Sequence, residues 1–174
     1  MLDSDDIRQM VKKNTPTPTD EDRKIVAKLW SDENCPYFDL IMFADGRILE
    51  LCPRKDSLDR SETVAPGRWM LVSEIPNPDA LDTSGGGYFA TMCRCDVPEL
   101  DLSISAGECA SHGGNGFVAV TSLSTGEFKW LGFFLESNPF DGIKVKDQEI
   151  IASSTTNKKY HFPLEHPEQV RIEH

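Results

Sequence analysis

Long apolar runs are missing from this chain of 174 residues. No stretch approaches the roughly 20 consecutive apolar residues that a membrane-spanning helix needs. The start, "MLDSDDIRQMVKK", also lacks the basic-then-apolar order of a secretory signal. We therefore expect a cytoplasmic protein that does not enter a membrane.

Positive charge is scarce. The chain has 18 lysines and arginines against 29 aspartates and glutamates, which gives a net charge of -11. This balance opposes binding to phosphate backbones and to anionic lipids, so we expect no nucleic-acid or membrane partner. An acidic surface suits two roles, namely simple solubility and a docking face for a basic protein.

A disulfide framework is not indicated either. The five cysteines are odd in number and scattered, at Cys35, Cys52, Cys93, Cys95 and Cys109. This distribution fits reduced thiols in a cytosol. The stability of the fold must therefore come from a hydrophobic core.

The composition permits one compact domain. Hydrophobic residues make up 39% and aromatics 9% of the chain, so the signature of a disordered protein is absent. The length is close to the usual upper size of a single domain. We predict one domain over residues 1–174, with a helical N-terminal segment over 1–34 and a β-rich body over 35–174.

The stretch "TPTPTDEDRKIVAKLW" predicts a helix near residues 20–30. Thr19 or Asp20 can cap its N-terminus, and acidic side chains in the first turn favour the positive end of the helix dipole. Apolar residues recur from Ile25 at i, i+1, i+4 and i+5, which gives the helix one apolar face. A second helix is expected over residues 2–13.

After residue 35 the pattern changes to period two and to short apolar runs between turn residues, which predicts strands. We expect an α+β fold, mainly an antiparallel β-sheet, with the N-terminal helix packed on one sheet face. The predicted strands and turns are a hairpin with a two-residue loop at Asp45–Gly46, strands over 67–76, 88–97 and 99–106, a hairpin turning at Ser124–Gly126, a hairpin over 148–164, and a terminal strand over 168–174.

Residues 93–112, "CRCDVPELDLSISAGECASH", hold the four candidate metal ligands, which are Cys93, Cys95, Cys109 and His112. Zinc sites usually place two residues between paired cysteines, whereas Cys93 and Cys95 have one residue between them. On an extended strand that spacing puts both side chains on one face, beside Phe89 and Thr91, where they act as small hydrophobes. We therefore expect structural cysteines, no metal and no other cofactor.

A catalytic thiol is the alternative interpretation of the same segment, with Cys109 as nucleophile and His112 as base. Nothing nearby supplies an orienting acid or oxyanion donors, and the chain has no G-x-S-x-G, H-E-x-x-H or EF-hand pattern. The glycine-rich stretches "DTSGGGYF" and "SHGGNGF" lie between predicted strands and lack the strand-to-helix context of a phosphate-binding loop. We therefore predict no enzymatic activity and no catalytic residue.

The C-terminal segment "FKWLGFFLESNPFDGIKVKDQEIIASSTTNKKYHFPLEHPEQVRI", residues 128–172, is the most distinctive part of the chain. Its most specific pieces are Asn138-Pro139-Phe140, Phe162-Pro163-Leu164 and Pro167-Glu168. In these pieces it resembles small acidic bacterial immunity proteins, the antidotes made beside polymorphic, contact-dependent or type VI secreted toxins. A purely structural interpretation also fits, with Asn138-Pro139 as a turn and Phe140 in the core.

The resemblance implies a protein that binds a cognate toxin and neutralises it by stoichiometric occlusion of the toxin's active site. Candidate contacts are Tyr88, Asp96, Glu99 and Asp101, three acidic residues near a predicted strand edge and an aromatic beside a glycine loop. Two alternatives from other classes stay open. One is a small cytosolic enzyme that uses Cys109 and His112, and the other is a small-ligand-binding regulatory module whose sheet encloses a pocket.

Overall fold

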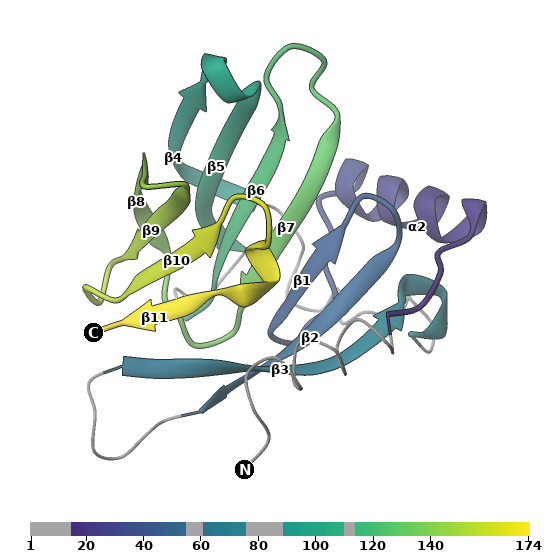
Figure 1. Ribbon diagram of the computed structural model, residues 1–174, viewed down its shortest axis with the longest axis horizontal. Helices are drawn as coiled ribbons and strands as arrows, with labels where there is room; N and C mark the ends of the chain where they lie inside the picture. The colour runs from purple at the N-terminus through teal and green to yellow at the C-terminus, as the bar shows by residue number, and fades with distance from the viewer. Residues whose placement is uncertain (1–14, 55–60, 76–88, 110–113) are drawn as a thin grey trace.

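The computed structural model describes residues 15–54, 61–75, 89–109 and 114–174, without the side chains of 53–54 and 61–66. These residues form an α+β fold that is mainly antiparallel sheet (Figure 1). The elements are α2 (Asp20–Ser31), β1 (Leu40–Phe43), β2 (Arg47–Arg54), β3 (Ser61–Leu71), η1 (Val72–Glu74), β4 (Phe89–Val97), η4 (Pro98–Leu100), β5 (Leu102–Cys109), β6 (Gly116–Ser122), β7 (Phe128–Phe134), β8 (Phe140–Lys146), β9 (Glu149–Ser154), β10 (Lys159–Pro163), η5 (Pro167–Gln169) and β11 (Arg171–Glu173).

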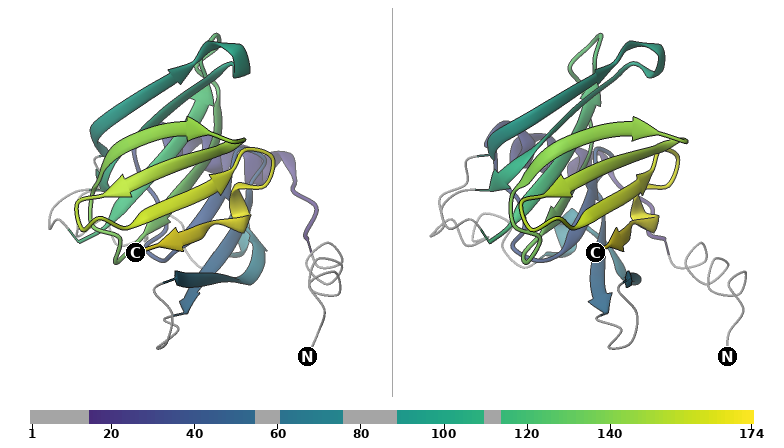
Figure 2. Two further views of the ribbon diagram at one scale, coloured as in Figure 1. Left: turned by 60° about the vertical axis from the view of Figure 1, so that its left-hand side comes forward. Right: turned by 90° about the vertical axis from the view of Figure 1, so that its left-hand side faces the viewer.

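The described strands form one hydrogen-bonded sheet in the order β4-β5-β6-β7-β1-β2-β3-β11-β10-β9-β8. The sheet folds over on itself, so that β8 to β11 lie across β4 to β7 as a second layer (Figure 2). The change of layer occurs at β3, which pairs with β2 and also, at its N-terminal end, with β11. As a result, β4 and β8, at the two ends of the strand order, lie close together.

Alternation along the central strands builds two hydrophobic cores. In β7, Trp130 and Phe134 face the space between the two sheet layers, whereas Leu131 and Phe133 face α2 on the other side. We call the cluster between the two sheet layers the inner core and the cluster between the sheet and α2 the outer core. The side chains of β6 divide in the same way, with Val118 in the inner core and Phe117 and Ala119 in the outer core. The fold therefore has three layers: the helix α2, the central part of the sheet, which is buried on both of its faces, and the layer of β8 to β11.

Aromatic side chains join the two sheet layers. The ring of Phe134 in β7 lies 4.8 Å from that of Tyr160 and 5.9 Å from that of Phe162, both in β10, between ring centroids. Phe140, the first residue of β8, packs edge-on against both Phe134 and Tyr160. Phe134, Phe140 and Phe162 are fully buried. Asn138, two residues before Phe140, has a left-handed backbone conformation with φ 60°. The turn and core roles predicted for Asn138 and Phe140 are therefore confirmed.

The helix α2 is attached to the sheet through Asp22. Its carboxylate accepts hydrogen bonds from the backbone N–H and hydroxyl of Thr19, at 2.7 Å each, which completes a reciprocal N-terminal cap. The other oxygen accepts from the backbone N–H of Ser73 at 3.2 Å. A Cβ atom at Gly46 would overlap the Asp22 side chain, and Gly46 has a φ of +99°. Helix, β1–β2 turn and η1 therefore meet at one buried carboxylate.

The predicted helix near residues 20–30 is confirmed, whereas several strand predictions need correction. The β1–β2 loop has three residues, 44–46, because Gly46 follows the turn in a positive-φ conformation. β3 begins before the predicted residue 67, and β5 begins at Leu102 because residues 98–100 form η4. β8 was not predicted, and the helix expected over 2–13 lies outside the described residues. In the described part of the chain, no helix has the length and apolarity to cross a membrane.

We predict that Asp22→Asn lowers the free energy of unfolding by about 1 to 3 kcal/mol, because a buried cap loses its charged acceptor. Burial raises the pKa of Asp22, but hydrogen bonds from Ser73 and Thr19 outweigh it and hold that pKa at about 2. The contribution is thus complete above the ordinary carboxyl pKa of about 3.9 and is lost as the pH falls towards 2.

Urea unfolding of both proteins at pH 7 and pH 3 tests this prediction. The matched control is Asp20→Asn, in the same helical turn, whose carboxylate is exposed and pairs with Arg23; a change within about 0.5 kcal/mol is expected. Equal losses in the two variants would contradict the role assigned to Asp22.

Candidate functional site

The seam between β4 and β8 is the place where the folded sheet remains open. Each strand has a hydrogen-bonded neighbour on one side, β5 and β9 respectively, and each ends the strand order on the other side. At one end of the seam the strands touch, because the Cys93 thiol donates to the carbonyl oxygen of Phe140 over 3.7 Å. At the other end they separate, and a groove of about 420 Å³ lies between them.

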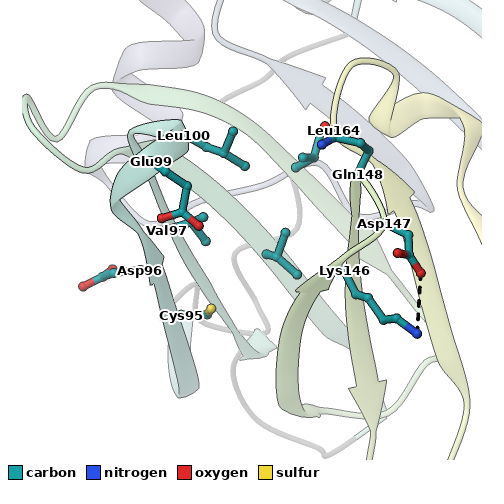
Figure 3. Close-up of a pocket in the computed structure, with 10 residues that line it drawn as sticks. Cys95, Asp96, Val97, Glu99, Leu100, Lys146, Asp147, Gln148 and Leu164 are labelled. Atoms are coloured by element: carbon teal, nitrogen blue, oxygen red, sulfur yellow. Dashed lines mark ion pairs between the residues drawn. The ribbon is translucent and has the colours of Figure 1, made fainter.

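The groove has two walls, which Figure 3 shows from the open side. The first wall is the end of β4 with η4, and it contributes residues 95–97, Glu99 and Leu100. The second is the end of β8 with the turn into β9, residues 145–148, together with Leu164 after β10. Because both strands run towards the groove, their C-terminal ends and the turns that follow them form its rim.

The groove combines an apolar lining with acidic side chains. Val97, Val145 and Leu164 supply apolar surface. Leu100 is 40% exposed, which is unusual in a chain whose other leucines are mostly covered. Glu99 has no hydrogen-bond or ion-pair partner among the described residues. Groups of this kind bind a partner that carries both apolar surface and positive charge.

The second wall includes a strained turn. Asp147 and Gln148 form the two-residue loop between β8 and β9, with φ values of 52° and 63°. Both central residues of such a turn need positive φ, and Asn-Gly is the usual solution because other residues are strained there. The turn is held in place by the backbone N–H of Leu164, which donates to the carbonyl oxygen of Gln148 over 2.9 Å. Strained backbone of this kind is often found at binding sites.

The candidate contacts from the sequence have different positions. Glu99 lines the groove on the first wall, where its side chain lies beside Val97 (Figure 3). Asp96 is at the groove's edge, but its carboxylate points away and accepts from the Ser103 hydroxyl at 2.8 Å and from Arg94 at 3.0 Å. These hydrogen bonds, Ser103 first, lower the pKa of Asp96. Tyr88 lies outside the described residues.

Asp101 joins two turns and does not line the groove. It ends η4 in a left-handed conformation with φ 52°. Its carboxylate accepts from the Ser122 hydroxyl at 2.6 Å and from the backbone N–H of Ser124 at 2.8 Å. These bonds lower the pKa of Asp101 and connect η4 to the β6–β7 turn. Asp101 therefore supports the first wall from behind.

The cysteines face two different cores. Cys93 and Cys95 pack against the inner core, on one face of β4 as predicted. Phe89 packs against the outer core, so the expectation that it shares their face is wrong. A bulge between Thr91 and Cys93 inserts one residue and reverses the side-chain alternation. Across from it, a Cβ atom at Gly107 would overlap the carbonyl oxygen of Ala90, so only glycine fits there.

Cys109 is separated from the other two cysteines by the sheet, because it packs against the outer core. Burial, and then the charge of Glu33, raises the pKa of its thiol to about 11, whereas a nucleophilic cysteine needs a lowered pKa. His112 lies outside the described residues. Among the residues that are described, no three His, Cys, Asp or Glu side chains gather in a way that would hold a metal ion.

Sequence reasoning missed the second wall of the groove. Val145 and the turn at Asp147 and Gln148 were not singled out, and Leu164 was noted only for the family resemblance and not as part of a groove. The alternation of Ile143 and Val145 with lysines was an available signal for β8, but a bulge between Phe140 and Gly142 interrupts the period at its start. No protein-family model matches the chain, and no curated protein matches it.

Two alanine variants distinguish a residue that stabilises the wall of the groove, Asp101, from a residue that only lines the groove, Glu99. We expect Asp101→Ala to lower the midpoint of thermal unfolding by about 2 to 4 °C, because two turns lose their shared acceptor. Glu99→Ala should change the midpoint by less than about 1 °C, because an exposed side chain without a partner contributes little. Scanning calorimetry of both variants measures this, and a larger loss for Glu99→Ala would show that Glu99 has a structural role.

Replacing the strained residue Gln148 with glycine should stabilise the protein. Gln148→Gly removes the cost of a left-handed residue, about 1 to 2 kcal/mol. Part of this gain is lost, because glycine raises the conformational entropy of the unfolded chain. A net gain of about 0.5 to 1 kcal/mol in the free energy of unfolding is expected. Gln148→Ala is the matched control, since alanine keeps the strain. Urea unfolding would refute the assignment if both variants behaved alike.

Proposed function

We propose that the protein is a bacterial immunity protein that binds a cognate toxin and neutralises it by stoichiometric occlusion of the toxin's active site. The observation that carries the proposal is the groove at the open seam, which offers exposed Leu100 beside Glu99, whose carboxylate has no partner among the residues that the structure describes. The resemblance of residues 128–172 to such proteins and the net charge of -11 support it. The proposed toxin has a basic active-site cleft, and the proposed place of action is the cytoplasm.

The character of the groove favours protein binding over catalysis. Apolar residues form much of it, and its charged side chains lie near its rim, as in the centre and border of many protein interfaces. The thiol alternative is disfavoured by the raised pKa of Cys109. A small-ligand module enclosed by the sheet is disfavoured because rings such as Phe134 and Phe162 fill the space between the layers.

Co-expression with the product of the neighbouring gene tests the proposal, since immunity genes lie beside the toxins they counter in the family that the chain resembles. The neighbouring protein should be toxic alone and harmless with this chain in excess. Titration calorimetry of the two purified proteins should give a one-to-one complex. A neighbour that is harmless alone, or that stays toxic with this chain in excess, would rule out the immunity function.

The salt dependence of binding tests the electrostatic part of the proposal. Raising NaCl from about 0.05 M to about 0.5 M should slow association at least about tenfold and change dissociation by less than about threefold, because exposed charges act mainly on the encounter. Glu99→Lys should likewise act first on the association rate. Surface plasmon resonance measures both rates. Association that is insensitive to salt would contradict steering by the acidic surface.

A further inference from the structure

We infer that the seam groove receives an arginine side chain, carried on a partner loop between apolar residues. This assignment rests on the proposed function and names the chemistry by which the partner is recognised. It concerns the groove between η4 and the β8–β9 turn, lined by Val97, Glu99, Leu100, Val145 and Asp147. Three features of the groove lead to it: its shape, the arrangement of its charges, and its rigidity.

The shape of the seam excludes a strand that would run its whole length. A strand inserted between β4 and β8 needs roughly 10 Å between them, which is twice the spacing of neighbouring strands. At the closed end the Cys93 sulfur is 3.7 Å from the carbonyl oxygen of Phe140, which leaves no room. The groove lies at the other end, from Cys95 onwards. The partner therefore enters with side chains and not with a strand of its own.

The groove's charges and apolar surface match one basic side chain. Val97 and Val145 line the space in which the aliphatic stem of an arginine would lie. Glu99 lies on one wall and Asp147 on the other, where the Asp147 carboxylate is turned towards Lys146 (Figure 3). Lys146, the only basic residue in the lining, lies 3.5 Å from Asp147, so the three acids of the lining, Asp96 included, and the one base leave a negative balance. The planar guanidinium can bond to a carboxylate through two N–H groups.

The carboxylate on the second wall is held by a rigid backbone. Asp147 sits in the strained two-residue turn, and Leu164 fixes that turn through the carbonyl oxygen of Gln148. A pre-positioned group loses little conformational freedom when a partner binds. Leu100, on the opposite wall, supplies exposed apolar surface for the residues that flank the arginine. Buried arginine and apolar anchors are typical of the residues that dominate binding energy.

A peptide titration tests the inference without the toxin. The probe is an acetylated and amidated pentapeptide with a central arginine between leucines and terminal glycines, and its partner probe has citrulline, a neutral isostere, in place of arginine. Backbone amide spectra of the full chain should shift at residues 97, 99 and 100 and at residues 145–148, with a Kd below about 5 mM for the arginine peptide. The citrulline peptide should bind at least about tenfold more weakly. No shift in these segments, or equal binding of both peptides, would overturn the inference.

Variants identify the groups that bind the peptide. Glu99→Gln with Asp147→Asn should abolish the preference for arginine over citrulline. Asp20→Asn with Glu21→Gln, an equal change of charge on exposed α2, should preserve it. Glu99→Lys with Asp147→Lys should prefer a peptide with central glutamate, and a variant that fails to fold cannot gain such a preference. An unchanged preference for arginine in the reversed variant would refute the assignment.

The result with the neighbouring gene product separates this inference from the proposed function. If the wild-type chain neutralises that protein and Glu99→Gln with Asp147→Asn binds it equally well, the arginine assignment is wrong and the immunity function stands. If the wild-type chain does not bind that protein, the immunity function is wrong, and the peptide titration still decides what the groove accepts.

Discussion

The aromatic contact between the two sheet layers is the interaction on which the remaining architecture depends. Phe134 from β7 lies against Phe140, Tyr160 and Phe162, which come from β8 and β10. These rings bury large apolar areas, and they hold the second layer over the first. Because Phe140 is the first residue of β8, the same contact places the start of that strand beside β4. The seam is therefore closed at the aromatic end and open at the other.

An open seam is a liability that the protein limits in two ways. Exposed strand edges invite pairing with other chains, and closing one end of the seam shortens the exposed part of both edges. The Cys93 thiol, whose pKa is raised chiefly by burial, remains protonated and donates to Phe140 at that end. The open end keeps an exposed leucine and a strained turn. Proteins tolerate such features at binding surfaces, because the residues that bind a partner best are often not the residues that stabilise the fold best.

Not all of the acidic side chains behind the net charge of -11 are available to interact with a partner. Asp22 and Asp101 are fully engaged as hydrogen-bond acceptors within the fold. Glu149 accepts from Arg171 at 2.8 and 2.9 Å and lies 3.2 Å from His161, and these contacts, Arg171 first, lower its pKa. Glu99 in the groove differs from them, because its carboxylate has no partner in the described part of the chain.

The sequence by itself determined the local structure: the helix that begins after Thr19, the turn at Asp45 and Gly46, and the inward alternation of Cys93 and Cys95. Caps, turn residues and periodicity act over a few neighbouring residues, so they can be read from the chain. Only the tertiary structure decided the groove. It joins residues 95–100 to residues 145–148, which no local pattern connects, because the folding over of the sheet brings its two ends together. The same long-range packing gave Asp101 its hydrogen-bond donors and left Glu99 without a partner in the described part of the chain, although the two residues are both acidic and nearly adjacent in sequence.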